Sequence, residues 1–244
     1  MLVKLVLPVA YLKVLVNLQE VYSKLTNNRI SKMRLPLPQF GSPSFNPNHI
    51  AEVIETSTTG FMAQCLEPEG LTFPTMPAFG SWVKSIEEED NTNVMYGVVY
   101  HATTTPIDSV HRARALGLSL TELREQQPQI FAMLKTEIRV ALVGFVASNR
   151  VYQHLPSRPP QIHQAVYTCS TDEIEEFTEE LYFLRTLAQL PGAPVDELVA
   201  AVLRDVYQAR GCDREWLVRA GRNLSILLKD DYDRLSAILS QVHV

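Results

Sequence analysis

The stretch NVMYGVVYHATTTPID at residues 93–108 decides the fold that we expect for this chain. Between residues 94 and 101, valine and tyrosine at the even positions alternate with Met, Gly, Val and His at the odd positions. These residue types favour a pleated, half-buried surface, and their alternation is typical of a β-strand. The polar residues that follow predict a hairpin or a loop. This stretch therefore predicts a central strand that leads into a polar connection.

Further short strands surround this central one. The candidates are residues 49–56, 60–66, 79–86 and the strongly apolar run at 138–146. Closely spaced short strands with turn residues between them are typical of a small antiparallel barrel or sandwich. Ser119, followed three residues later by Glu122, is a capping box that predicts a short helix inserted between two barrel strands.

The last third of the chain shows helical patterns. Ser170 and Glu173 form a second capping box, which predicts a helix over 172–190. Pro194 opens the next helix, whose apolar residues recur at i, i+3, i+4 and i+7, and Gly211 is a suitable end for it. Two more amphipathic patterns follow, and the short connections between these helices predict a small bundle.

We therefore predict an α+β protein in which a small antiparallel β-barrel with an inserted short helix precedes a helical bundle. The expected divisions are an N-terminal apolar segment at 1–32, the barrel at 33–153, a proline-rich linker at 154–170 and a helical domain at 171–244.

The N-terminal segment leaves three interpretations open. Lys4, Pro8 and Lys13 interrupt its apolar residues before they reach the roughly 20 that a membrane-spanning helix needs, so we predict no transmembrane segment. The segment is a helix that docks on the body, an interfacial segment on a membrane, or an artefactual extension upstream of a true start at Met33.

Charge and cysteine content narrow the functional classes. Residues 1–32 contain five basic and one acidic residue, whereas residues 161–244 contain eight basic and fourteen acidic residues. An acidic body disfavours nucleic acid as a partner, although it leaves a local basic patch possible. The three cysteines lie far apart without a C-x-x-C pair, which favours a reducing compartment, and we expect a cytoplasmic protein.

Common catalytic signatures are missing from the sequence. It contains no phosphate-binding G-x-x-x-x-G-K-[ST] loop, no G-x-G-x-x-G, no G-x-S-x-G and no H-E-x-x-H. We therefore expect no enzyme, no catalytic residue, no metal site and no cofactor.

One polar cluster follows the central strand. Asp108, His111, Arg112 and Arg114 lie within seven residues of one another, next to Ser109. Adjacency in one loop says almost nothing about a catalytic triad, because a fold brings triad members together from different places. Polar turn residues that bond to their own backbone are the simpler explanation. We retain Asp108, His111, Arg112 and Arg114 as a candidate loop for contact with a partner.

Two aromatic residues on predicted strands, Trp82 and Tyr96, are candidate platforms for stacking nucleic-acid bases. Their strand positions and acidic surroundings favour a place in the core instead.

Three motifs resemble those of a known barrel family: HIAEVIETSTTGFMAQ at 49–64, FGSWVK at 79–84 and MYGVVY at 95–100. Together with the strand at 136–146, they resemble the HAS barrel, the small β-barrel before the motor domain of HerA-type DNA-translocating ATPases. This barrel has a counterpart at the N-terminus of rotary ATP synthase subunits. The chain is similar to stand-alone HAS-barrel proteins of bacteria, cyanobacteria in particular.

The resemblance implies a role in assembly, because the barrel of these ATPases is an interaction module and a separate core performs catalysis. Here helical patterns stand where that ATPase core would follow. The resemblance thus implies a non-catalytic module that docks on a larger complex such as a HerA-like ATPase. Direct nucleic-acid binding by the barrel is the alternative.

Overall fold

A computed structural model describes residues 46–67, 76–87, 93–108 and 114–242 of the protein. The predictions for residues 1–32 lie outside this part of the chain. The described residues belong to one compact unit that starts at Asn46.

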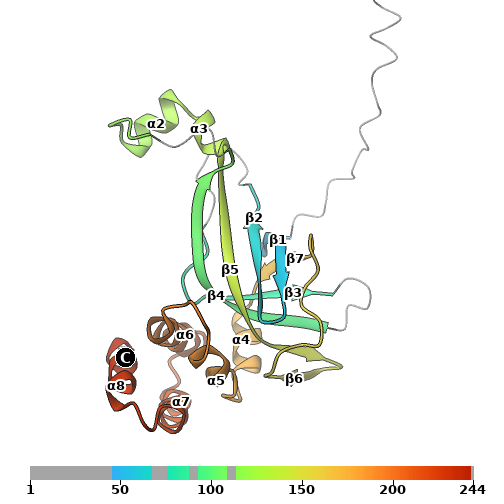
Figure 1. Cartoon of the computed structure of the whole chain (residues 1–244), viewed down its shortest axis with the longest axis vertical. Helices are drawn as coiled ribbons and strands as arrows, with labels where there is room; N and C mark the ends of the chain where they lie inside the picture. Colours follow the sequence, from blue (N-terminus) through green and yellow to red (C-terminus); the bar gives the residue numbers. More distant parts are fainter. Residues whose placement is uncertain (1–45, 68–75, 88–92, 109–113, 243–244) are drawn as a thin grey trace, which may run out of the picture. The chain divides into compact units, whose positions relative to one another are not determined.

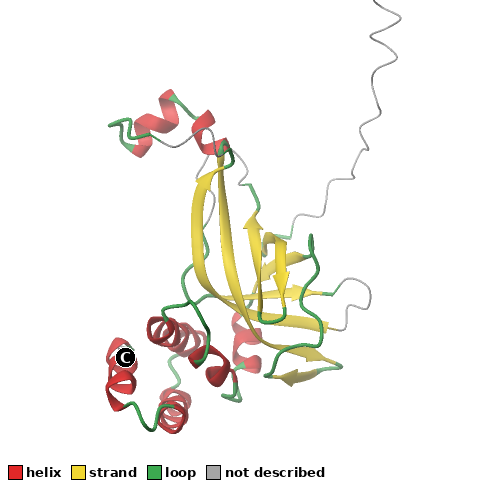
Figure 2. Cartoon of the chain, viewed as in Figure 1, coloured by secondary structure: helices red, strands yellow, loops and turns green. Residues whose placement is uncertain are grey.

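The described strands form a closed antiparallel barrel (Figures 1 and 2). They are β1 (His49–Ser57), β2 (Gly60–Cys65), β3 (Trp82–Ile86), β4 (Asn93–Pro106), β5 (Leu134–Ala147), β6 (Arg150–Tyr152) and β7 (Ala165–Thr168). The sheet order is β2-β1-β7-β3-β4-β5-β6, and β2 also pairs with β5. Six strands therefore close on themselves while β6 extends β5, and the predicted small barrel is confirmed.

Residues 95–99 of β4 are buried on both faces of the strand. Met95 and Val99 lie in the apolar cluster that fills the barrel, whereas Tyr96 and Val98 lie in a second cluster shared with the C-terminal helices. A strand covered on both sides needs apolar residues at successive positions. This double burial accounts for the apolar character of residues 94–100.

Seven helices accompany the barrel in the described part of the chain. They are α2 (Leu120–Gln126), α3 (Gln129–Ala132), α4 (Thr171–Phe177), α5 (Phe183–Ala188), α6 (Val195–Ala209), α7 (Arg214–Leu227) and α8 (Tyr232–Gln241). Helices α2 and α3 are inserted between β4 and β5, as the sequence predicts. Both predicted capping boxes are present, at the starts of α2 and α4.

The C-terminal helices pack directly on the barrel wall. Phe177 of α4 stacks on Tyr96 with ring centroids 4.7 Å apart, and it also contacts Trp82 at 5.6 Å. Phe183 of α5 meets the edge of the Trp82 ring at 5.4 Å. Barrel and helices thus share one hydrophobic core. Trp82 and Tyr96 lie in this core, as expected, with 1% and 6% of their surface exposed.

The structure differs from the expected linker at 154–170, because residues 165–168 form strand β7 between β1 and β3. The proline-rich composition ends at Pro160, and the segment AVYT that follows it suits a strand. The hydroxyl of Ser85 donates a hydrogen bond of 2.9 Å to the carbonyl of Ala165. The domain boundaries predicted at residues 33, 153 and 171 stay predictions.

The single helix expected over 172–190 is wrong, since α4 and α5 are separated by residues 178–182. The side chain of Gln153 satisfies backbone groups at this break. Its amide nitrogen donates to the carbonyls of Phe177 (2.5 Å) and Glu180 (2.8 Å), and its oxygen accepts from the amide of Phe183 (3.0 Å). A residue of the barrel domain therefore replaces the hydrogen bonds that a continuous helix would make.

An ion pair between Lys84 of β3 and Glu173 of α4 links the barrel to the helices. Partial burial disfavours the charged form of Glu173, but hydrogen bonds from Lys84 and from the Ser170 backbone outweigh this effect. They hold the pKa of Glu173 below its ordinary value. A lowered pKa contributes stability that is present above the ordinary pKa and is lost as the pH falls through the folded-state pKa.

We expect Glu173→Gln to lower the free energy of unfolding near neutral pH and to have little effect in acid, where the wild-type carboxyl is also uncharged. Urea unfolding of both proteins between about pH 7 and about pH 3 measures this difference. A difference that stays constant over the whole range would contradict the assignment.

Candidate functional site

The far half of the β4–β5 hairpin extends past the barrel as a two-stranded arm (Figure 1). Residues 104–106 of β4 pair only with residues 134–136 of β5 among the described strands. The hydroxyls of Thr104 and Thr136 are hydrogen-bonded across this pair at 2.7 Å. The arm therefore holds the segment between its strands away from the barrel wall.

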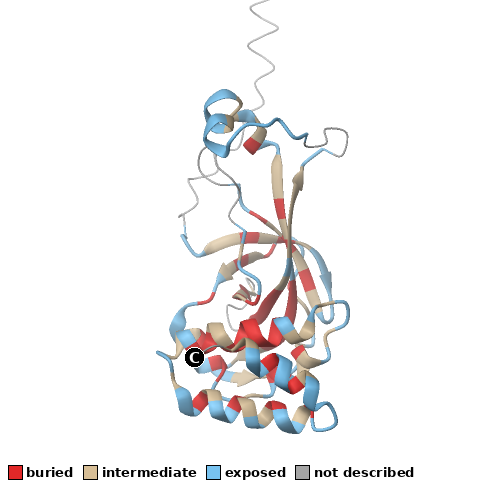
Figure 3. Cartoon of the chain, turned by 90° about the vertical axis from the view of Figure 1, so that its left-hand side faces the viewer, coloured by how far each residue is buried: buried red, intermediate tan, exposed pale blue. Residues whose placement is uncertain are grey.

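Helices α2 and α3 lie at the end of this arm, and we call residues 107–108 and 114–133 the arm tip. Ser119 caps α2, because its hydroxyl accepts from the amide of Glu122 at 3.3 Å while the Glu122 carboxylate accepts from the amide of Ser119 at 2.8 Å. No residue of α2 is buried, and α3 buries only Phe131. Figure 3 shows most of the arm tip in the colour of exposed residues.

The arm tip exposes a group of large apolar side chains. They are Ile107 (52% exposed), Leu116 (47%), Leu118 (36%), Leu120 (56%) and Met133 (42%). Large exposed apolar surfaces mark sites of interaction with proteins, ligands or membranes, and these five exposed apolar side chains all belong to one short segment of the chain. The arm tip is therefore the first candidate functional site.

The predicted partner-contact loop leads into this site. Asp108 and Arg114 are both exposed and both belong to the arm tip. His111 and Arg112 lie outside the described residues. The sequence analysis did not single out the apolar residues at 116, 118 and 120 as part of a site. The recurrence of leucine at every second position was the available signal.

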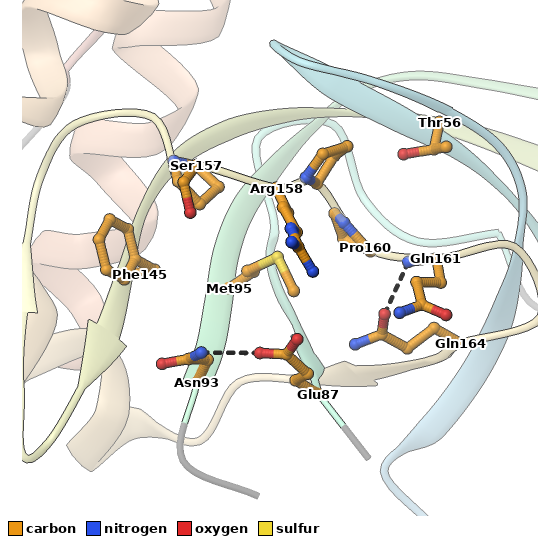
Figure 4. Close-up of a pocket in the computed structure, with 12 residues that line it drawn as sticks. Thr56, Glu87, Asn93, Met95, Phe145, Ser157, Arg158, Pro160, Gln161 and Gln164 are labelled. Carbon is orange, nitrogen blue, oxygen red and sulfur yellow. Dashed lines mark hydrogen bonds between the residues drawn. The ribbon is translucent and has the colours of Figure 1, made fainter. Parts of the chain in front are cut away.

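The second candidate site is a hollow at one end of the barrel, and we call it the barrel-end pocket. It has a volume of about 580 Å³. Its lining comes from the ends of β1, β3, β4 and β5 and from the loop after β6 (Figure 4). The residues are Thr56, Glu87, Asn93, Met95, Phe145, Pro156, Ser157, Arg158, Pro159, Pro160, Gln161 and Gln164.

Hydrogen bonds fix the walls of the barrel-end pocket. The Gln164 side chain, only 6% exposed, donates to the carbonyl of Ile86 at 2.7 Å and accepts from the amide of Gln161 at 2.7 Å. The Asn93 amide donates to the Glu87 carboxylate at 2.7 Å. Arg158 has no hydrogen-bond or ion-pair partner among the described residues, and its guanidinium points toward the middle of the lining residues (Figure 4).

Two of the three cysteines, Cys65 and Cys169, are buried in the hydrophobic clusters. Burial raises the pKa of Cys65 to about 11 and the pKa of Cys169 further still, so both thiols stay protonated and unreactive at neutral pH. The described ranges hold no group of three or more metal-ligating His, Cys, Asp or Glu side chains. No helix in the part of the chain that the structure describes is long and apolar enough to cross a bilayer.

Most of the barrel matches a known protein family. Residues 50–146 match the family model of the HAS barrel domain. This stretch of the chain is a HAS barrel domain. The match begins in β1 and ends at the last residues of β5, so it contains the arm and its two short helices.

Strand β7, which completes the HAS barrel of this chain, lies after the matched residues, as do helices α4 to α8. No curated protein matches the chain.

Proposed function

We propose that this chain is a non-catalytic interaction module of the cytoplasm that docks on a larger protein assembly. The presence of a HAS barrel domain supports this role, because the family resemblance implies assembly rather than catalysis. The same resemblance makes a HerA-like oligomeric ATPase the first partner to test.

The exposed apolar side chains of the arm tip are the observation on which the proposal rests. Helix α2 has seven residues and buries none of them. Helices this short gain most of their stability from tertiary packing, and α2 has little of that packing among the described residues. A partner that covered Leu118 and Leu120 would supply it.

Charge gives a further clue to the partner's surface. The charged residues described in the arm tip have mixed signs: Asp108, Arg114, Glu122, Arg124 and Glu125. Such a mixture attracts neither a strongly acidic nor a strongly basic surface. The docking partner therefore offers an apolar groove with a polar rim.

Charged substitutions at the arm tip test the proposal. We expect the double variant Leu118→Asp, Leu120→Asp to lose at least about tenfold in affinity for the oligomeric ATPase that the wild-type chain captures from its native host, because two aspartates would enter an apolar contact. Affinity purification with quantitative mass spectrometry, followed by titration of the purified partner, measures this loss. Aspartate at the first position of α2 suits the helix dipole, so the helix itself is preserved.

Val218→Asp is the matched control, because Val218 lies on α7 and is 51% exposed, close to the 56% of Leu120. It should bind like the wild type. Equal capture by the arm-tip variant and the wild type would place the docking surface elsewhere. Unaided hydrolysis of ATP by the purified chain would contradict the non-catalytic role.

Direct nucleic-acid binding, the alternative drawn from the sequence, has less support. The aromatic candidates Trp82 and Tyr96 are buried, and helices cover the outer face of the barrel around them. This alternative would be supported if the protein bound single-stranded oligonucleotides and if the affinity fell steeply with rising salt concentration.

A further inference from the structure

We propose that the barrel-end pocket binds the free C-terminus of a peptide chain, with the terminal carboxylate on Arg158. This site is separate from the arm tip and does not depend on the docking proposed there.

Arg158 is a cation that the described part of the protein leaves without a partner. Its side chain extends from the loop after β6 toward the middle of the pocket-lining residues (Figure 4). A guanidinium presents a planar fork of donors whose geometry matches a carboxylate. An anionic group on a ligand is therefore the natural counterpart of this side chain.

The loop that holds Arg158 is fixed in place. Gln161 is hydrogen-bonded to the buried Gln164, and the amide of His163 donates to the carbonyl of Val53 at 2.8 Å. Three prolines, at 156, 159 and 160, restrict the backbone further. Binding to a loop that is already ordered loses little conformational entropy.

Glu87 limits which anion fits. Its carboxylate lies on the opposite side of the pocket and is oriented toward Arg158, but no ion pair joins them (Figure 4). A dianion such as a phosphate monoester would be repelled by Glu87. Glu87 repels a carboxylate with a single negative charge less strongly than a dianion. A peptide N–H next to that carboxylate would donate a hydrogen bond to Glu87.

Apolar side chains also line the barrel-end pocket. Met95, which is 5% exposed, and the ring of Phe145 form part of the lining. They suit an apolar terminal side chain. A free chain end, unlike a continuous chain, has the terminal carboxylate that Arg158 would bind. The volume of about 580 Å³ is typical of ligand pockets.

Two peptides that differ only at the terminus test the assignment. Acetyl-glycyl-alanyl-leucine with a free carboxylate is titrated into the full ¹⁵N-labelled chain, and the same peptide with a C-terminal amide is the control. We expect the free acid to shift the backbone and side-chain amide signals of Gln161 and Gln164, and to bind at least about tenfold more tightly than the amide.

Arg158→Gln should weaken binding of the free acid by at least about tenfold. Arg150→Gln is the matched control: Arg150 is exposed on β6, does not line the pocket, and should leave binding unchanged. Both arginines are exposed, so neither change should affect folding. Equal binding of acid and amide, displacement of the acid by an equal concentration of inorganic phosphate, or no signal change with any probe would overturn the proposal.

Discussion

Replacing Phe177 with alanine is expected to lower the free energy of unfolding by about 3–5 kcal/mol. Phe177 is 1% exposed, and its ring lies against both Tyr96 and Trp82 of the barrel. The substitution would remove these contacts and leave a cavity where the barrel meets α4. Urea unfolding followed by circular dichroism measures the change.

Tyr182→Ala provides the control, because Tyr182 lies close in sequence but is 68% exposed. This substitution should change the free energy of unfolding by no more than about 0.5 kcal/mol. A loss below about 1 kcal/mol for Phe177→Ala would mean that the barrel and the helices do not depend on a shared core.

Gly144→Ala is the second substitution with a large expected effect. A Cβ atom at this position of β5 would lie 2.2 Å from the backbone oxygen of Tyr152 and 2.8 Å from the ring of Phe177. Backbone cannot move aside as a flexible side chain can, so β6 would have to shift away from β5. We expect the free energy of unfolding to fall by about 3 kcal/mol, at the upper end of the usual cost of overpacking. The same urea unfolding experiment measures this change.

We expect Gly221→Ala, in contrast, to raise the free energy of unfolding. Gly221 lies within α7, and the nearest atom that a Cβ would meet there is 3.9 Å away, on the side chain of Leu239. Alanine in a helix interior should stabilise the protein by about 0.5–1 kcal/mol. If both substitutions destabilised the protein equally, close packing at Gly144 would not be the cause.

Features set by local sequence could be predicted. The alternation at residues 94–101 and the two capping boxes depend on neighbours within a few positions, and the structure has β4, α2 and α4 at these places. The apolar stripe after Pro194 likewise corresponds to α6 (Val195–Ala209). In each case the residues that specify the element lie within it.

Features that depend on distant residues could not be predicted. The break between α4 and α5 is satisfied by Gln153, which lies 24 to 30 residues earlier in the chain. Strand β7 has four residues, and its place between β1 and β3 is decided by pairing across the sheet.

The two candidate sites also escaped prediction in part. Arg158 lies among prolines, which indicated a linker, and nothing in its neighbours shows that the loop closes one end of a barrel. The apolar residues of the arm tip are unusual only because the fold leaves them exposed. Exposure is a property of tertiary packing, and composition does not reveal it.

Site-specific photo-crosslinking in the native host tests the docking claim most directly. A photoreactive amino acid replaces Leu120 in the arm tip in one strain and Val218 on α7 in the other, and mass spectrometry identifies the crosslinked products. We expect crosslinks from position 120 to one subunit of an oligomeric assembly, and none to that subunit from position 218. Crosslinks to the assembly from position 218 alone, or from neither position, would contradict docking through the arm tip.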